Sequence, residues 1–63
     1  MAGYRLYFFG LDGRIFAFEA FEAETDVAAL TQANLLAGGA NPHSWELWRG
    51  SHRVHAGVRP ALA

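Results

Sequence analysis

The sequence predicts a small α+β domain with the element order ββαββ. Three observations predict it. Two alternating aromatic runs meet at Asp12-Gly13, a segment rich in alanine and leucine follows, and a second alternating pair meets at Gly50-Ser51. Asp-Gly between apolar runs is a strong hairpin signal, and Gly-Ser fits a type II′ turn. Residues 1–63 are expected to form one domain, with 58–63 as a loose tail.

The first hairpin should pair residues 4–9 with 14–20. A two-residue turn would pair Leu11 with Arg14, whereas a type I turn with a glycine bulge would pair Phe9 with Arg14. Because strand side chains alternate, both registers give the same two faces. The first face is a candidate interaction face of aromatic and arginine residues: Arg5, Tyr7, Phe9, Arg14, Phe16 and Phe18. The second face carries Tyr4, Leu6, Phe8, Ile15, Ala17, Glu19 and Phe21.

A helix is expected over residues 26–37. Thr25 or Asp26 can cap its start, and Gly38-Gly39 can end it by accepting the left-handed conformation. On a helical wheel, the side that would face the sheet includes Val27, Leu30, Ala33 and Ala37. Alanine lets a helix approach a sheet closely, but such a helix covers little area.

The second hairpin should pair residues 43–49 with 52–57, and it is amphipathic. Its polar face would set Glu46 opposite His55 and Trp48 opposite Arg53. Trp48, Arg53 and His55 therefore form a second candidate surface.

The favoured sheet is wholly antiparallel with the strand order 2-1-3-4, and the helix packs on one face. The alternative order 1-2-3-4 requires a parallel pair. One short helix cannot cover both apolar faces of the first hairpin, and large exposed apolar patches mark interaction sites. We therefore expect a homodimeric structural or protein-interaction module, joined through sheet faces or strand edges; another protein partner is the alternative.

Composition narrows the function classes. The chain has 63 residues, no cysteine, 52% hydrophobic residues and a net charge of −1. A chain this short buries only ~60% of its unfolded surface, so association would add stability. The charge gives no electrostatic case for nucleic acid. No apolar run approaches the ~20 residues of a membrane span, and no leader pattern is present, so a cytoplasmic protein is expected.

No catalytic, cofactor-binding or metal-binding residue is predicted, so an enzyme is disfavoured. His52 and His55 are three apart, which sends them to opposite faces of a strand. Two alternatives remain open. One is a single-stranded nucleic-acid binder or antitoxin-like regulator using the aromatic face. The other is a ligand carrier or enzyme with Glu19 in an interface pocket, where its pKa would be raised.

The layout YRLYFF, then DGRI, then ETD before an A-L-rich segment, then SWELWRG, resembles a group of very short, uncharacterised bacterial proteins. The resemblance covers nearly the whole chain and implies a bacterial origin and a ββαββ fold. The hairpin at Asp12-Gly13 and the helix after it are also distantly similar to HicB-like antitoxin domains. The Gly-rich segment that those domains carry between hairpin and helix is absent here.

Overall fold

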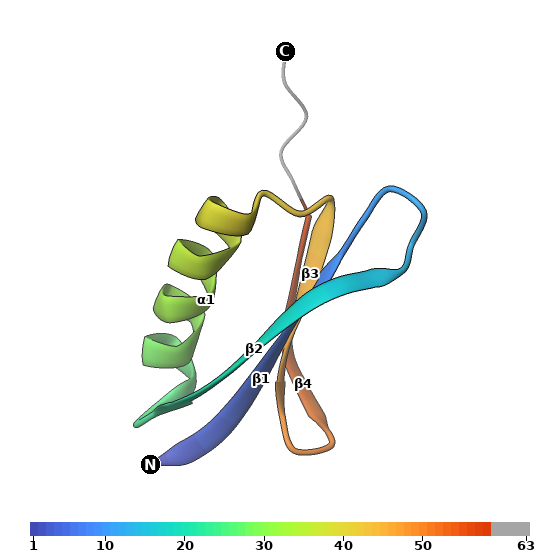
Figure 1. The fold of residues 1–63 in the computed structure, drawn as a ribbon. Helices are drawn as coiled ribbons and strands as arrows, with labels where there is room; N and C mark the ends of the chain where they lie inside the picture. Colours follow the sequence, from blue (N-terminus) through green and yellow to red (C-terminus); the bar gives the residue numbers. More distant parts are fainter. Residues whose placement is uncertain (59–63) are drawn as a thin grey trace.

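The sheet order is the first feature that the computed structural model settles. The structure describes residues 1–58, which include β1 (Ala2–Phe9), β2 (Ile15–Ala23), α1 (Asp26–Ala40), β3 (Ser44–Arg49) and β4 (His52–Val58). The strands form one antiparallel sheet in the order β2-β1-β3-β4, with α1 against one face (Figure 1). The predicted fold and strand order are confirmed, and the order 1-2-3-4 is wrong. Val58 ends β4 rather than starting a tail, and the rest of the predicted tail, 59–63, lies outside the described residues.

The first turn uses glycine as predicted but in a different register. The Gly13 amide donates to the Gly10 carbonyl (3.0 Å), and the Gly10 amide donates to the Arg14 carbonyl (2.9 Å). Gly13 has φ 78°, a left-handed conformation that glycine accepts readily. Arg14 therefore lies opposite Gly10, and neither Leu11 nor Phe9 is its partner.

A β-bulge in β2 changes which residues share a face. Phe8 pairs with Ala17 but Phe9 pairs with Ile15, so Phe16 is the extra residue. Its ring stacks on Phe8, with ring centres 6.2 Å apart. Phe16 was predicted on the face of Phe9 and in fact lies on the face of Phe8, whereas Ile15 joins Phe9.

The helix begins as expected and ends later. The Thr25 side chain accepts from the Ala28 amide (3.1 Å), which confirms it as the N-cap. Gly38-Gly39 does not end the helix, because Asn41 does so with φ 52° while its amide donates to the Ala37 carbonyl. Asparagine tolerates this conformation, and a residue before proline disfavours the right-handed helix, so the chain turns at Asn41-Pro42.

The core lies between α1 and one face of the sheet. The helix presents a buried stripe of Ala29, Ala33 and Ala37 to β1, β2 and β3. The sheet residues buried in the same core are Tyr4, Leu6, Phe8, Ala23, Trp45 and Leu47. Val27 was expected in this stripe but is 76% exposed. The face of Tyr4 is therefore the covered one, which the sequence left open.

A second bulge lies in β4. Leu47 pairs with His55 and Trp48 pairs with Arg53, so Val54 is the extra residue. His55 therefore shares a face with Leu47, and its ring lies against Trp45 at a centre distance of 5.4 Å. The expected pairing of His55 with Glu46 is wrong, whereas that of Trp48 with Arg53 is confirmed.

A polar cluster joins the start of the helix to the sheet. The Tyr4 hydroxyl donates to Asp26 Oδ1 (2.6 Å), and Arg49 Nη1 binds the same oxygen (2.7 Å). Asp26 also lies in the first turn of α1, where a negative charge is favourable. The hydrogen bond to Asp26, followed by burial, raises the pKa of the Tyr4 phenol.

Candidate functional site

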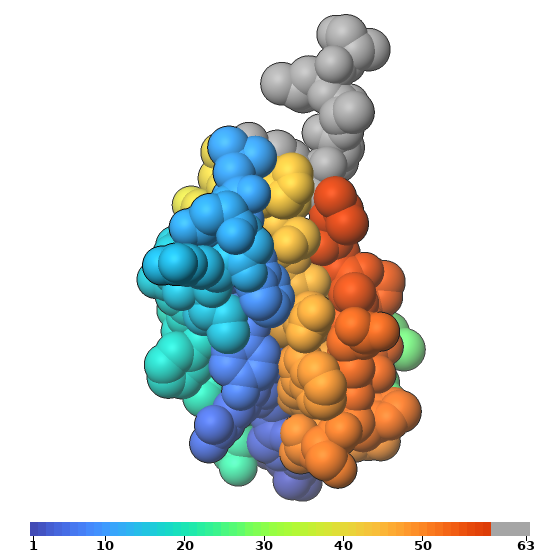
Figure 2. Space-filling view, turned by 90° about the vertical axis from the view of Figure 1, so that its right-hand side faces the viewer, coloured from blue at the N-terminus to red at the C-terminus, as the bar shows by residue number. Residues whose placement is uncertain are grey.

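The sheet face away from α1, called the open face below, is the main candidate site. Figure 2 shows it with the four strands side by side. The pairing register arranges its residues in rows that cross β2, β1, β3 and β4 in that order. The first row is Glu22 and Gly3; the second Ala20, Arg5, Trp48 and Arg53; the third Phe18, Tyr7, Glu46 and Ala56; the fourth Ile15, Phe9, Ser44 and Val58.

The aromatic end of the open face comprises Tyr7, Phe9, Ile15 and Phe18. Ile15 is 52% exposed and Phe18 is 60% exposed, and the Phe18 ring lies 6.3 Å from that of Tyr7. The other two residues are half-buried by their neighbours in the sheet. Cross-strand aromatic pairs stabilise the hairpin, but exposed side chains of this size also leave apolar area in water.

The charged corner comprises Arg5, Glu46, Trp48 and Arg53. Glu46 Oε1 accepts from the Trp48 indole nitrogen (2.9 Å), and Glu46 Oε2 lies 3.6 Å from Arg53 Nη1. Arg5 is the cross-strand neighbour of Trp48 on the other side. With Glu22 in the first row, the open face carries two arginines and two glutamates, so it is not a basic surface for a phosphate backbone.

A hollow of about 580 Å³ lies beside the charged corner. Gly3, Ala20 and Gly50 contribute little side chain to it, and Arg5, Tyr7 and Glu22 also line it. We call it the small-residue hollow. A β-carbon added at Gly3 would meet no atom within 4 Å, so this part of the hollow is empty space.

Most of the predicted site residues come together, and they form one surface rather than two. Arg5, Tyr7, Phe9 and Phe18 lie on the open face, where Trp48 and Arg53 join them. Three predicted members do not: Arg14 lies in the turn, Phe16 stacks on Phe8 and His55 packs on Trp45.

Sequence reasoning missed the small-residue hollow, Glu22 and Ile15. Small residues in a strand gave no signal by themselves, because their position relative to Arg5 and Tyr7 depends on the register. Ile15 was placed on the other face because the bulge at Phe16 has no sequence signature among apolar neighbours.

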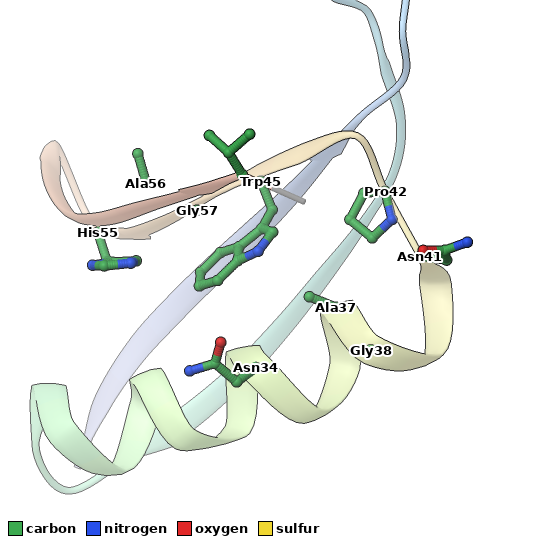
Figure 3. A pocket seen from close by; sticks show the side chains of 10 residues that line it. Asn34, Ala37, Gly38, Asn41, Pro42, Trp45, His55, Ala56 and Gly57 are labelled. Atoms are coloured by element: carbon green, nitrogen blue, oxygen red, sulfur yellow. The ribbon is translucent and has the colours of Figure 1, made fainter. Parts of the chain in front are cut away.

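A second hollow, of about 470 Å³, lies on the helix side between α1 and β4. Figure 3 shows the Trp45 ring pointing from β3 toward Ala37 of the helix. Trp45 and His55 line this hollow with Asn34, Pro42 and Gly57. Its volume falls within the ~300–1,000 Å³ of ligand pockets, but its polar side chains Asn34, Asn41 and His55 are all exposed.

The described residues do not form a cluster suited to metal binding. Among residues 1–58, no three His, Asp or Glu side chains gather as a metal site requires. Glu19 pairs with Leu6 on the helix side of β2, is exposed, and lines neither hollow. The described chain therefore gives Glu19 no closed pocket.

Comparison of the chain with protein-family models, curated proteins and solved structures finds no match. Over residues 1–58, the structure has no helix with the length and apolar character that crossing a membrane requires.

Proposed function

We propose that this chain is a non-enzymatic, homodimeric protein-interaction module whose two copies pack open face against open face. The observation that carries the proposal is the exposed aromatic end, above all Phe18 and Ile15. The helix covers the other face of the same sheet, so the open face has no covering layer from within residues 1–58. A second sheet is one of the standard partners for such a face.

The area of the open face fits a stable dimer. Strand spacing of ~4.8 Å and a rise of ~3.3 Å per residue give four six-residue strands a flat footprint of roughly 400 Å². Side-chain relief adds to this footprint. A standard interface buries ~800 Å² per partner, so the flat footprint supplies about half of that area and side-chain relief has to supply the rest, whereas a single strand edge offers much less.

The free edges of the sheet are poorly suited to association. Both edge strands, β2 and β4, contain a bulge, at Phe16 and Val54 respectively. The edge strand β2 also carries Glu19 and Glu22, and β4 carries Arg53. Bulges and charges are the features with which proteins prevent edge-to-edge pairing. The face is thus the better surface for a partner.

Charge balance favours a second copy over an oppositely charged partner. Arg5 and Arg53 lie on the same face as Glu22 and Glu46. A surface with equal numbers of both signs can complement itself, because a two-fold axis brings residue i of one copy to residue j of the other.

Sedimentation equilibrium at tens of micromolar protein tests the proposal. We expect a species of twice the 6.9 kDa chain mass. Phe18→Glu should dissociate it because it places a charge in the apolar contact, whereas Ala17→Glu, on the helix side of the same strand, should not. A folded wild-type monomer at this concentration would contradict the proposal.

A further inference from the structure

On β1 and β2, the open face carries phenylalanine side chains at one end and very small residues toward the other. Phe18 and Phe9 project from the third and fourth rows, whereas Ala20 and Gly3 occupy the first two rows on the same strands. The small-residue hollow lies at this second end. The protruding and recessed parts of the face are therefore separated along the strand direction.

Two kinds of two-fold axis can pack two open faces together. An axis parallel to the strands sets each row over the same row of the partner. With the axis midway across the sheet, Arg53 of one copy would then lie over Ala20 of the other, in the same row as that copy's Arg5, and Phe18 would lie over Ala56. The exposed phenylalanine would miss the small-residue hollow, and the arginines of both copies would gather in one row, which is unfavourable because like charges repel.

An axis perpendicular to the strands, between the second and third rows, gives a different result. It reverses the row order, so that Phe18 of one copy lies over Ala20 of the other and Phe9 lies over Gly3. The same operation sets Glu46 over Trp48 of the other copy, between that copy's Arg5 and Arg53. Large side chains then meet small ones and acid meets base.

We infer that the dimer has this second symmetry: Phe18 of each copy inserts into the small-residue hollow of the other, and each Glu46 faces the other copy's Arg5 and Arg53. This inference rests on the face-to-face dimer proposed above. The contact is reciprocal, because each copy supplies one protruding phenylalanine and one hollow. The side chain of Phe18 is thus an anchor of the interface on each copy's β2.

Complementary variants test the inference. Ala20→Trp fills the hollow while keeping Phe18, and Ala20 is exposed, so the monomer has space for the indole. Phe18→Ala removes the protruding ring and keeps the hollow. Each variant alone should dimerise at least about 30-fold more weakly than wild type, the effect of losing an anchor residue.

An equimolar mixture of the two variants should restore a dimer. Phe18 of the Ala20→Trp chain enters the free hollow of the Phe18→Ala chain, and the introduced indole occupies the space left by the missing ring. Native mass spectrometry identifies this heterodimer because its mass differs from that of either homodimer. Ala17→Trp, on the helix side of β2, is the matched control and should dimerise like wild type.

Gly3→Trp fills the same hollow from β1, where the space around the glycine is free, and guards against a folding defect specific to Ala20→Trp. Circular dichroism confirms that each variant is folded. The proposed symmetry would be wrong if both hollow-filling variants dimerised like wild type, or if the mixture formed no heterodimer. Either result would still be compatible with a dimer of another geometry. A wild-type monomer would instead overturn the dimer itself.

Discussion

The two faces of this sheet have similar sequences and very different surroundings. The covered face has Tyr4, Leu6 and Phe8 in β1, all nearly inaccessible to solvent, and the open face has Tyr7 and Phe9 in the same strand. In β2 the contrast is weak, because Phe16 beside Phe8 is 55% exposed and Phe18 on the open face is 60% exposed. Aromatic content therefore does not distinguish a core face from a surface in this chain.

The helix makes the difference between the faces. Its alanine stripe lets it approach the sheet closely, and its main contacts are with β1, β2 and β3. A single helix of this kind covers one face only, and even there the start of β2 stays exposed, with Phe16 55% accessible. The apolar side chains exposed on the open face can be buried only by a partner.

The largest expected effect is the loss of stability caused by a substitution in the covered face. Phe8→Ala should lower the free energy of unfolding by about 3–5 kcal/mol, because it leaves a cavity in the covered core. A small domain has only ~5–15 kcal/mol of stability, so this variant should be close to unfolding. Urea denaturation followed by circular dichroism measures the loss.

Phe18→Ala is the matched substitution on the open face. At protein concentrations where only monomer is present, it should cost less than about 1 kcal/mol, since its ring is mostly exposed. Equal losses for Phe8→Ala and Phe18→Ala in the monomer would show that the open face is not a separate surface.

The sequence predicted the two hairpins and the helix start, because the turns and the cap at Thr25 are local signals. It also predicted the strand order, because the alternative order 1-2-3-4 requires a parallel pair. It could not predict the bulges at Phe16 and Val54. One extra residue in a strand moves the side chains between the bulge and the next turn onto the opposite face of the sheet. In a mostly apolar strand, the sequence is compatible with the bulged and the regular pairing alike. The open face was accordingly predicted in its middle, at Tyr7 and Phe18, and mispredicted near the ends of β2 and β4.

The end of the helix shows a different limit. Gly38-Gly39 and Asn41-Pro42 are both stop signals, and only the second operates. A glycine within the last turn costs about 1 kcal/mol relative to alanine, which packing of Ala37 on the sheet can offset. Choosing between two such signals requires the tertiary contacts.

A second contrast concerns two glycines on opposite faces. A β-carbon at Gly57 would lie 2.2 Å from Trp45 Cε2, because the indole lies directly on the glycine, whereas one at Gly3 would meet nothing. Gly57→Ala should therefore destabilise the fold by about 1–3 kcal/mol through overpacking. Gly3→Ala should be neutral or slightly stabilising, because alanine reduces the freedom of the unfolded chain.

Thermal unfolding of these two variants, followed by circular dichroism, tests the contrast. If Gly57→Ala were as stable as Gly3→Ala, the indole could not be seated on the backbone of β4 as described.

A smaller effect concerns the helix that creates the covered face. Thr25→Ala removes the side-chain oxygen that accepts from the Ala28 amide and should cost about 1 kcal/mol. Thr31→Ala is the control, since that hydroxyl only bonds the Val27 carbonyl within the helix and alanine is the better helix former. Denaturant midpoints should fall for the first variant and stay equal or rise for the second.

The smallest expected effect is a pH dependence of the cluster that joins the helix to the covered face. The hydrogen bond from Tyr4 to Asp26 and burial raise the pKa of this phenol in the folded state. Above the ordinary tyrosine pKa of ~10, the unfolded chain therefore loses the Tyr4 proton more readily than the folded one. Stability should then fall as the pH rises from about 9 toward the folded-state pKa, because the unfolded state binds fewer protons.

Tyr4→Phe should be less stable than wild type at neutral pH but should lose less stability with rising pH. Urea unfolding of both proteins across this range measures the two slopes. Parallel slopes would mean that the Tyr4 hydroxyl does not hold its proton through Asp26, and that the helix start is attached to the covered face by Arg49 alone.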